Sequence, residues 1–127
     1  MSNIPNPFED EAEEKWPKEF AESQERLSKL SGEELEAVFE EGTNITVGLA
    51  QALQDGYSAD SEKVHGLIGR HYQWICNFWT PTSEAYIGLG QLYVEDPKFT
   101  AHYEEFAPGL AAFIALAIEE YAHSSLT

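Results

Sequence analysis

The residues best suited to recognise a ligand are aromatic side chains crowded into the middle of the chain. Trp74, Phe78 and Trp79 fall within six positions, and two tyrosines follow. Such rings stack on flat heteroaromatic groups, and their polar tips can orient what they hold. His71 precedes the run and either hydrogen-bonds a ligand or fills the core. The predicted ligand-binding residues are His71, Trp74, Phe78, Trp79, Tyr86 and Tyr93, with Trp16 and Phe20 forming part of a lid.

Side chains that could perform catalytic or metal chemistry are not arranged for it. The sequence contains no Gly-rich phosphate loop, no HExxH motif and no Gly-x-Ser-x-Gly motif. His65 and His71 are six residues apart, which places them on different sides of a helix. Cys76 has no basic residue within a helical turn, which favours an inert thiol over a nucleophile. We therefore predict a binding protein that is not an enzyme and has no metal or cofactor.

The charge balance and the single cysteine narrow the choice of partners. The 127 residues include 23 acids and 7 bases, for a net charge of −16. Such a chain is repelled by nucleic-acid phosphates and by anionic membranes. One cysteine allows no intramolecular disulfide, and no stretch approaches the ~20 apolar residues of a membrane span. Because the N-terminus also lacks the features of a signal peptide, we expect a soluble, cytoplasmic monomer.

Helical periodicity dominates the chain, and no alternating strand pattern with hairpin signals is present. Ser31 to Glu34 fits a capping box, and Asp96-Pro97 is an N-cap followed by a first-turn proline. Thr80 and Pro81 are interpreted in the same way. The predicted helices are Phe8 to Trp16, Lys18 to Leu30, Ser31 to about 54, about Ser61 to Phe78, Pro81 to about Glu95, Pro97 to about 106, and Pro108 to at least Tyr121.

These segments predict an all-α domain with globin-like packing of about six to seven short helices. Tight turns with proline caps join the helices, and short helices crossing at steep angles can leave a pocket between them. Most acids lie before Gly42, whereas the chain from Gly42 on is rich in core-forming residues. We predict a flexible arm at 1–7 and a single domain at 8–127. Within it, acidic helices at 8–55 form a lid over a helical core at 60–123.

Several motifs resemble those of one known family. The segment Tyr93-Val94-Glu95-Asp96-Pro97-Lys98-Phe99 and the later Pro108-Gly109-Leu110-Ala111 are similar to the hallmarks of TipAS antibiotic-recognition domains. The acidic segment ending at Trp16 and the His71-x-x-Trp74-Ile75 pattern also resemble that family, so the likeness covers about residues 8–122. It implies a globin-like all-α fold that binds thiopeptide-like or other large aromatic antibiotics. In this family the domain follows the DNA-binding part of MerR-type activators, or occurs alone and sequesters the drug.

One departure from the family pattern changes the expected chemistry. The thiopeptide-binding founder of the family traps its ligand through a cysteine in the loop before the helix that carries Tyr86. Counting back from Asp96, that position is Pro81 in this chain, and Cys76 lies five residues earlier. We therefore expect reversible, non-covalent sequestration or sensing of the drug, which gives resistance. The alternative is a protein-interaction or effector module that belongs to, or is partnered with, a MerR-type transcriptional regulator.

Overall fold

The computed structural model describes residues 17–126, and over this range the regular structure is entirely helical. The all-α prediction is therefore confirmed, while the helix expected at 8–16 lies outside the described residues. The six described helices are α2 (Pro17–Ser28), α3 (Gly32–Gln54), α4 (Glu62–Ile75), α5 (Ser83–Glu95), α6 (Pro97–Glu104) and α7 (Leu110–Ser125).

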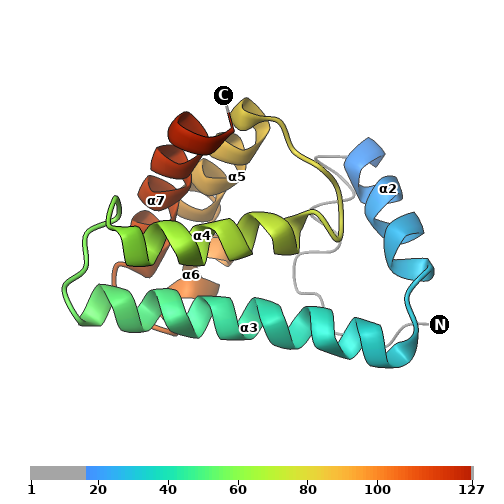
Figure 1. Ribbon diagram of the computed structural model, residues 1–127, viewed down its shortest axis with the longest axis horizontal. Helices are drawn as coiled ribbons and strands as arrows, with labels where there is room; N and C mark the ends of the chain where they lie inside the picture. Colours follow the sequence, from blue (N-terminus) through green and yellow to red (C-terminus); the bar gives the residue numbers. More distant parts are fainter. Residues whose placement is uncertain (1–16, 127) are drawn as a thin grey trace.

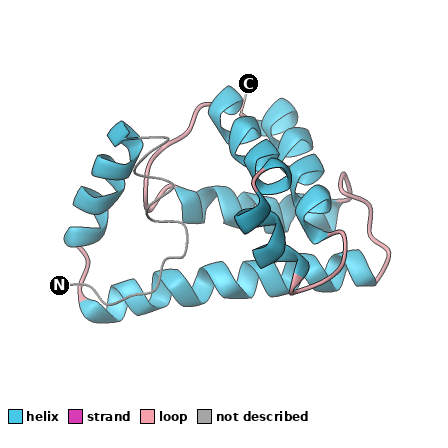
Figure 2. Ribbon diagram, turned by 180° about the vertical axis from the view of Figure 1, so that it is seen from behind, coloured by secondary structure: helices cyan, strands magenta, loops and turns pink. Residues whose placement is uncertain are grey.

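Helices α3 and α4 form one group, and α5, α6 and α7 form a second group that crosses the first. Helix α2 lies apart from both (Figure 1). The long α3 and the shorter α4 run antiparallel to each other, and α5 and α7 pack together across α4 at a steep angle. The short α6 packs against α5 and α7 and is nearest the viewer in the reverse view (Figure 2). Short helices that cross steeply in this way form the predicted globin-like packing.

Local capping signals place several of the helix ends where the sequence predicts them. Ser31 and Glu34 form the complete capping box that starts α3, because the Ser31 hydroxyl accepts from the Glu34 N–H and the Glu34 carboxylate accepts from the Ser31 N–H. Asp55 ends α3, and Gly56 follows with a positive φ of 88°. Asp96 caps α6, with a proline in its first turn.

Two predicted helix starts are wrong by two residues. Thr82, rather than Thr80, caps α5 by accepting from the Ala85 N–H, so Pro81 lies before the helix. The buried Pro81 carbonyl accepts a hydrogen bond of 3.1 Å from the Tyr72 hydroxyl, which holds this residue in the loop. Helix α7 starts at Leu110 behind Gly109, whose φ of 84° favours glycine, and not at Pro108.

The hydrophobic core begins near the middle of α3. Among the residues whose burial is described, every buried hydrophobic side chain lies at Ile45 or later. Leu49 and Ala52 extend this contribution along the second half of α3, and α4, α5, α6 and α7 supply the rest. The predicted lid extended to residue 55, but Ile45, Leu49, Ala50 and Ala52 belong to the core. A movable segment is therefore restricted to residues before Gly42.

A carboxylate from α6 caps the start of α7 in place of the missing N-cap side chain. Glu104 accepts from the Gly109 N–H at 2.7 Å and from the Ala111 N–H at 3.1 Å. These two hydrogen bonds hold the pKa of the Glu104 carboxyl below its ordinary value of 4.5, and the backbone N–H of Leu110 makes a smaller contribution in the same direction. The carboxylate therefore links two successive helices and neutralises the exposed amides at the start of the second.

We expect Glu104→Gln to lower the free energy of unfolding at pH 7 by ~0.5–1 kcal/mol, a range that allows for the solvent exposure of the cap. Because the folded pKa of Glu104 is depressed, the stabilisation is complete above the unfolded pKa and is lost as the pH falls through the folded value. Urea unfolding at pH 7 and at pH 3 should show a smaller difference at pH 3 than at pH 7. Glu40→Gln, at an exposed position within α3, is the matched control. An equal loss at both pH values would contradict this assignment.

Candidate ligand-binding surface

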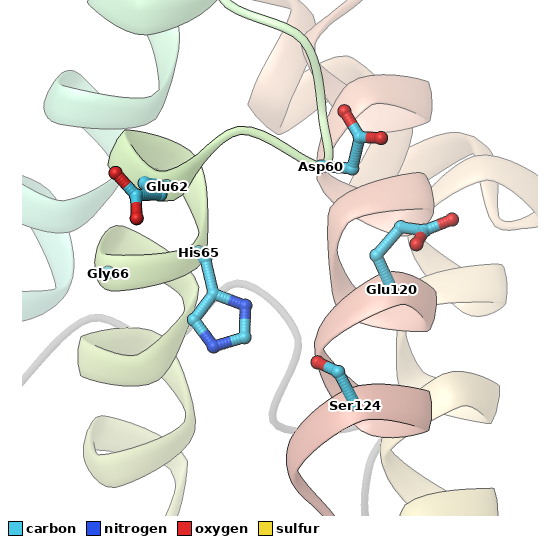
Figure 3. A pocket seen from close by; sticks show the side chains of 6 residues that line it. All are labelled: Asp60, Glu62, His65, Gly66, Glu120 and Ser124. Carbon is cyan, nitrogen blue, oxygen red and sulfur yellow. The ribbon is translucent and has the colours of Figure 1, made fainter.

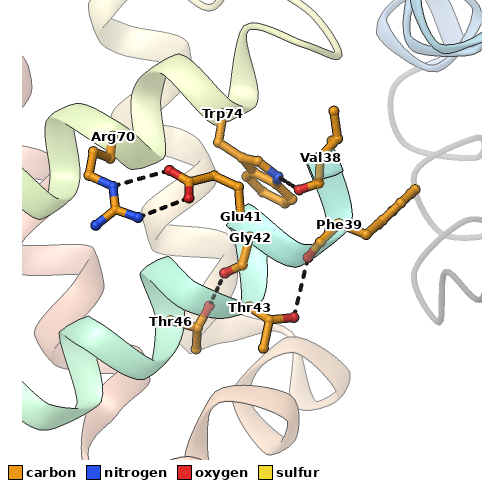
Figure 4. A network of polar contacts seen from close by, with 8 residues as sticks. All are labelled: Val38, Phe39, Glu41, Gly42, Thr43, Thr46, Arg70 and Trp74. Carbon is orange, nitrogen blue, oxygen red and sulfur yellow. Dashed lines mark hydrogen bonds and ion pairs between the residues drawn. The ribbon is translucent and has the colours of Figure 1, made fainter. Parts of the chain in front are cut away.

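The Trp74 indole is fixed against the backbone of α3. Its Nε1–H donates to the Val38 carbonyl at 2.7 Å, and its six-membered ring covers Gly42 (Figure 4). A Cβ at position 42 would lie 2.7 Å from Cζ2 of Trp74, closer than two carbon atoms can approach. A glycine at this position therefore allows the indole to lie on the helix.

A second interaction between the first half of α3 and α4 is an ion pair at the surface. The Arg70 guanidinium donates two hydrogen bonds to the Glu41 carboxylate, at 3.1 and 2.9 Å (Figure 4). This bidentate pair raises the pKa of Arg70, but its members are exposed, and such pairs typically contribute less than ~1 kcal/mol. Among the described residues, the first half of α3 is held to α4 by the Trp74 indole, which lies on Gly42, and by the surface ion pair of Arg70. This half of the helix has no buried hydrophobic side chain of its own.

His71, Tyr86 and Tyr93 meet inside the core. His71 is only 4% exposed, and its Nδ1 lies 2.6 Å from the Tyr86 hydroxyl oxygen. The Tyr93 ring meets the imidazole edge-on, with centroids 6.2 Å apart. Burial lowers the pKa of His71 to about 4, so the imidazole is neutral near pH 7. These three predicted site residues are brought together, but beneath the surface rather than on it.

Trp74, Phe78 and Trp79 are half-buried at the end of α4 and in the loop that follows it. We refer to these three residues as the aromatic surface. The rings of Trp74 and Phe78 meet edge-to-face with centroids 5.0 Å apart, and Trp79 packs against the edge of the core. Trp74 also lies 5.8 Å from His71, centroid to centroid. Trp74 is therefore the contact between the aromatic surface and the buried His71.

Among the described side chains of α2, Arg26 contacts the loop that follows α4. The Arg26 guanidinium donates to the Cys76 carbonyl at 2.7 Å and to the Thr80 hydroxyl at 3.2 Å, and it pairs with Glu22 within α2. This contact joins residues 50 and 54 positions apart, so no local signal in the sequence could have revealed it. Of the predicted lid residues, Trp16 and the side chain of Phe20 lie outside the described part of the structure.

Cys76 lies at the junction of α4 and this loop and is half-buried. Arg26 contacts it through its backbone carbonyl. The neighbouring Tyr72 hydroxyl donates to Pro81, and burial together with the nearby thiol raises the pKa of Tyr72. The thiol thus adjoins the loop that contains Pro81, but it belongs to a different backbone position.

A hollow of about 530 Å³ lies at the end of α4 opposite the aromatic surface (Figure 3). His65 projects into it, and its Nε2 lies 3.3 Å from the Ser125 hydroxyl. The hollow is open and acidic, with no Trp, Tyr or Phe among its lining residues, which are Asp60, Glu62, His65, Gly66, Glu120 and Ser124. Over residues 17–126, no group of three His, Cys, Asp or Glu side chains is placed to hold a metal ion, and no helix could span a membrane.

Comparison with known proteins finds one family model and several transcriptional regulators. The model described as the TipAS antibiotic-recognition domain matches residues 8–121. The regulator SkgA of Caulobacter vibrioides is 41% identical over 85 residues, which cover 65% of this chain and 33% of SkgA. The activator TipA of Streptomyces coelicolor is 29% identical over 117 residues, covering 90% of this chain and 46% of TipA. The chain thus spans less than half the length of these relatives.

Among solved structures, the chain resembles the complex of nosiheptide with TipAS, from a thiopeptide multidrug resistance system of Streptomyces lividans. The TM-score is 0.79 at 28% sequence identity, and the match covers 95% of this chain and 88% of that one. The likeness includes the helical arrangement described above, so fold and sequence point to the same family.

Proposed function

This chain belongs to the TipAS antibiotic-recognition domain family, and we propose that it binds large aromatic or peptidic antibiotics reversibly and catalyses no reaction. The observation that carries the proposal is the aromatic surface of Trp74, Phe78 and Trp79. It is half-buried beside α2 and the first half of α3, and the side chains described in these two segments include no buried hydrophobic one. The nosiheptide complex of the similar TipAS structure supports a thiopeptide as a suitable ligand.

The weakly held segments are suited to act as a lid. Helix α2 is joined to the loop after α4 through Arg26, and the first half of α3 is held through Trp74 and Arg70. Segments with few buried contacts open at low free-energy cost. When this lid, residues 17–41, moves away from α4, the Trp74 indole loses its hydrogen bond to the Val38 carbonyl and becomes more accessible to a ligand. Each ring that the ligand covers fully contributes ~1.5–3 kcal/mol by area, before ordering costs.

Reversible binding follows from the residues near the loop. Pro81 has no nucleophilic side chain, and its carbonyl accepts a hydrogen bond from the Tyr72 hydroxyl. Cys76 is half-buried at the end of α4. Non-covalent contacts with the aromatic surface therefore supply the affinity, and the domain sequesters the drug instead of consuming it.

Isothermal titration with nosiheptide tests the proposal, followed by intact-mass measurement of the mixture under denaturing conditions. We expect saturable binding of one ligand per chain and a protein mass unchanged by the ligand. A mass increase equal to one nosiheptide would contradict reversibility, and Cys76→Ser would then show whether Cys76 is the attachment point. No heat of binding for nosiheptide or for other thiopeptides would contradict the function itself.

A second function is favoured by the names of the relatives, which are HTH-type transcriptional regulators. In this alternative the domain is the effector module of a MerR-type regulator and passes ligand binding on to a DNA-binding part. We propose that the domain itself is monomeric and cytoplasmic and does not bind DNA, since its charge of −16 opposes contact with phosphates. Expressed alone in sensitive cells, a sequestering domain raises resistance, whereas an effector module does so only when joined to the DNA-binding part.

A further inference from the structure

The buried His71 has one nitrogen whose hydrogen-bonding capacity is unused. Its Nε2 is shielded from solvent and has no hydrogen-bond partner among the described residues, although Nδ1 contacts Tyr86. An unsatisfied buried polar group typically costs ~1–3 kcal/mol, and such groups in native structures usually have a reason. A leucine or phenylalanine would fill the same space in the core without this cost.

The Tyr86 hydroxyl determines which kind of group Nε2 offers. The Tyr86 oxygen lies 2.6 Å from His71 Nδ1 but 3.5 Å from the Ile68 carbonyl, its other acceptor. If Nδ1 carried the proton, the buried Tyr86 O–H could donate only across the longer distance. The Tyr86 hydroxyl therefore donates to Nδ1, which places the imidazole proton on Nε2. His71 thus holds a neutral N–H donor without an acceptor.

This donor lies one ring beneath the aromatic surface. Three aromatic rings contact the imidazole, those of Trp74, Tyr86 and Tyr93, and of these only Trp74 is partly exposed. A group entering from the surface would therefore approach beside the Trp74 indole, where Val38 of the proposed lid and the adjoining Gly42 now lie. None of the three surrounding rings carries a charge, so the site suits a neutral partner.

We propose that His71 Nε2–H selects the ligand by donating to a neutral hydrogen-bond acceptor, such as an azole nitrogen or an amide carbonyl oxygen, that enters beside Trp74. This role rests on the proposed antibiotic-binding function and adds a chemical requirement to it. Stacking on aromatic rings alone accepts many flat molecules, whereas a buried donor rejects analogues that lack the acceptor. The lowered pKa of His71 keeps the donor uncharged, which excludes recognition through an ion pair near pH 7.

The tautomer can be tested without any ligand. Long-range ¹H–¹⁵N correlation spectra of the ¹⁵N-labelled chain should show His71 as the Nε2–H tautomer at pH 7. In Tyr86→Phe, which lacks the hydroxyl that fixes the tautomer, the spectrum should shift toward a mixture of both forms. A pure Nδ1–H form in the unmodified chain would overturn this role of His71 and leave the proposed function untouched.

Binding variants then test the donor itself, with nosiheptide as the probe. We expect His71→Phe to bind nosiheptide about 10-fold more weakly, the loss of one hydrogen bond of ~1.4 kcal/mol. His71→Gln, whose amide N–H₂ reaches near the position of Nε2, should recover most of the affinity. Equal affinity of His71→Phe and the unmodified chain would overturn the proposal, and so would equal losses in both variants. Absence of binding by the unmodified chain would remove the proposed function and this role together.

Discussion

Replacing Trp74 with alanine is expected to weaken nosiheptide binding by about 10- to 100-fold. Trp74 is one of the two indoles of the aromatic surface, and it connects that surface to His71. Loss of its contact with a ligand removes ~1.5–3 kcal/mol of binding free energy, and each 1.4 kcal/mol is a factor of ten in Kd. The dissociation constant from isothermal titration measures the effect directly.

Two variants separate loss of the ring from loss of folding. Trp74→Phe retains a ring and should keep part of the affinity, although it lacks the N–H that bonds to the Val38 carbonyl. Tyr57→Ala removes an exposed aromatic side chain between α3 and α4, away from the proposed site, and should bind like the unmodified chain. If folded Trp74→Ala binds nosiheptide as tightly as the unmodified chain, the aromatic surface is not the binding site.

Gly42→Ala is expected to lower the free energy of unfolding by ~1–2 kcal/mol, although alanine normally favours a helix over glycine by about 1 kcal/mol. The added Cβ would meet Cζ2, Cε2 and Nε1 of Trp74 at 2.7 to 3.0 Å. The indole cannot retreat freely because its N–H is bonded to the Val38 carbonyl. The change therefore forces the first half of α3 away from α4, and urea unfolding measures the cost.

Gly66→Ala is the matched control, because a Cβ at position 66 in α4 would meet no atom within 4 Å. This variant should gain up to about 1 kcal/mol from helix propensity alone. The two substitutions are chemically identical and are expected to have opposite signs. Stabilisation of similar size at both positions would show that Trp74 does not press on Gly42 in solution.

The parts of the fold that depend on neighbouring residues were predictable from the sequence. The capping box at Ser31 and the cap of α6 at Asp96 use side chains within three residues of the backbone they satisfy, and the end of α3 at Asp55 is followed directly by Gly56. The start of α5 was predicted wrongly because two threonines compete for the cap, and a distant contact from Tyr72 decides between them. The sequence of residues 80–84 alone contains no information about that contact.

The candidate site was predictable by residue type but not by position in the fold. The sequence indicated His71, Tyr86 and Tyr93 together with Trp74, Phe78 and Trp79, and it could not separate the buried group from the surface group. Burial depends on which helix covers which face, and that is set by tertiary packing. Three features of the site were not predicted: the contact of Arg26 with the loop after α4, the hydrogen bond to the Val38 carbonyl, and the Nε2 of His71 that has no partner among the described residues. Each depends on contacts between residues far apart in sequence, or on the absence of such contacts.

The proposed lid has a definite boundary in this structure. Before Gly42 the described chain is held by Arg26, Trp74 and Arg70, whereas from Ile45 on it is anchored by buried hydrophobic side chains. Opening is thus expected to separate residues 17–41 from the end of α4 without disturbing the packing of α5 on α7. Ligand that fills the resulting space would restore order to those residues by replacing the contacts they lose.

Hydrogen–deuterium exchange of the chain with and without nosiheptide tests this account most directly, because it reports binding and its location in one measurement. We predict slower exchange on ligand binding in two segments, residues 17–41 and residues 74–82, with little change in α5 and α7. Protection confined to residues 60–66 and 119–124, around the acidic hollow, would contradict the account. So would an exchange pattern unchanged at saturating nosiheptide.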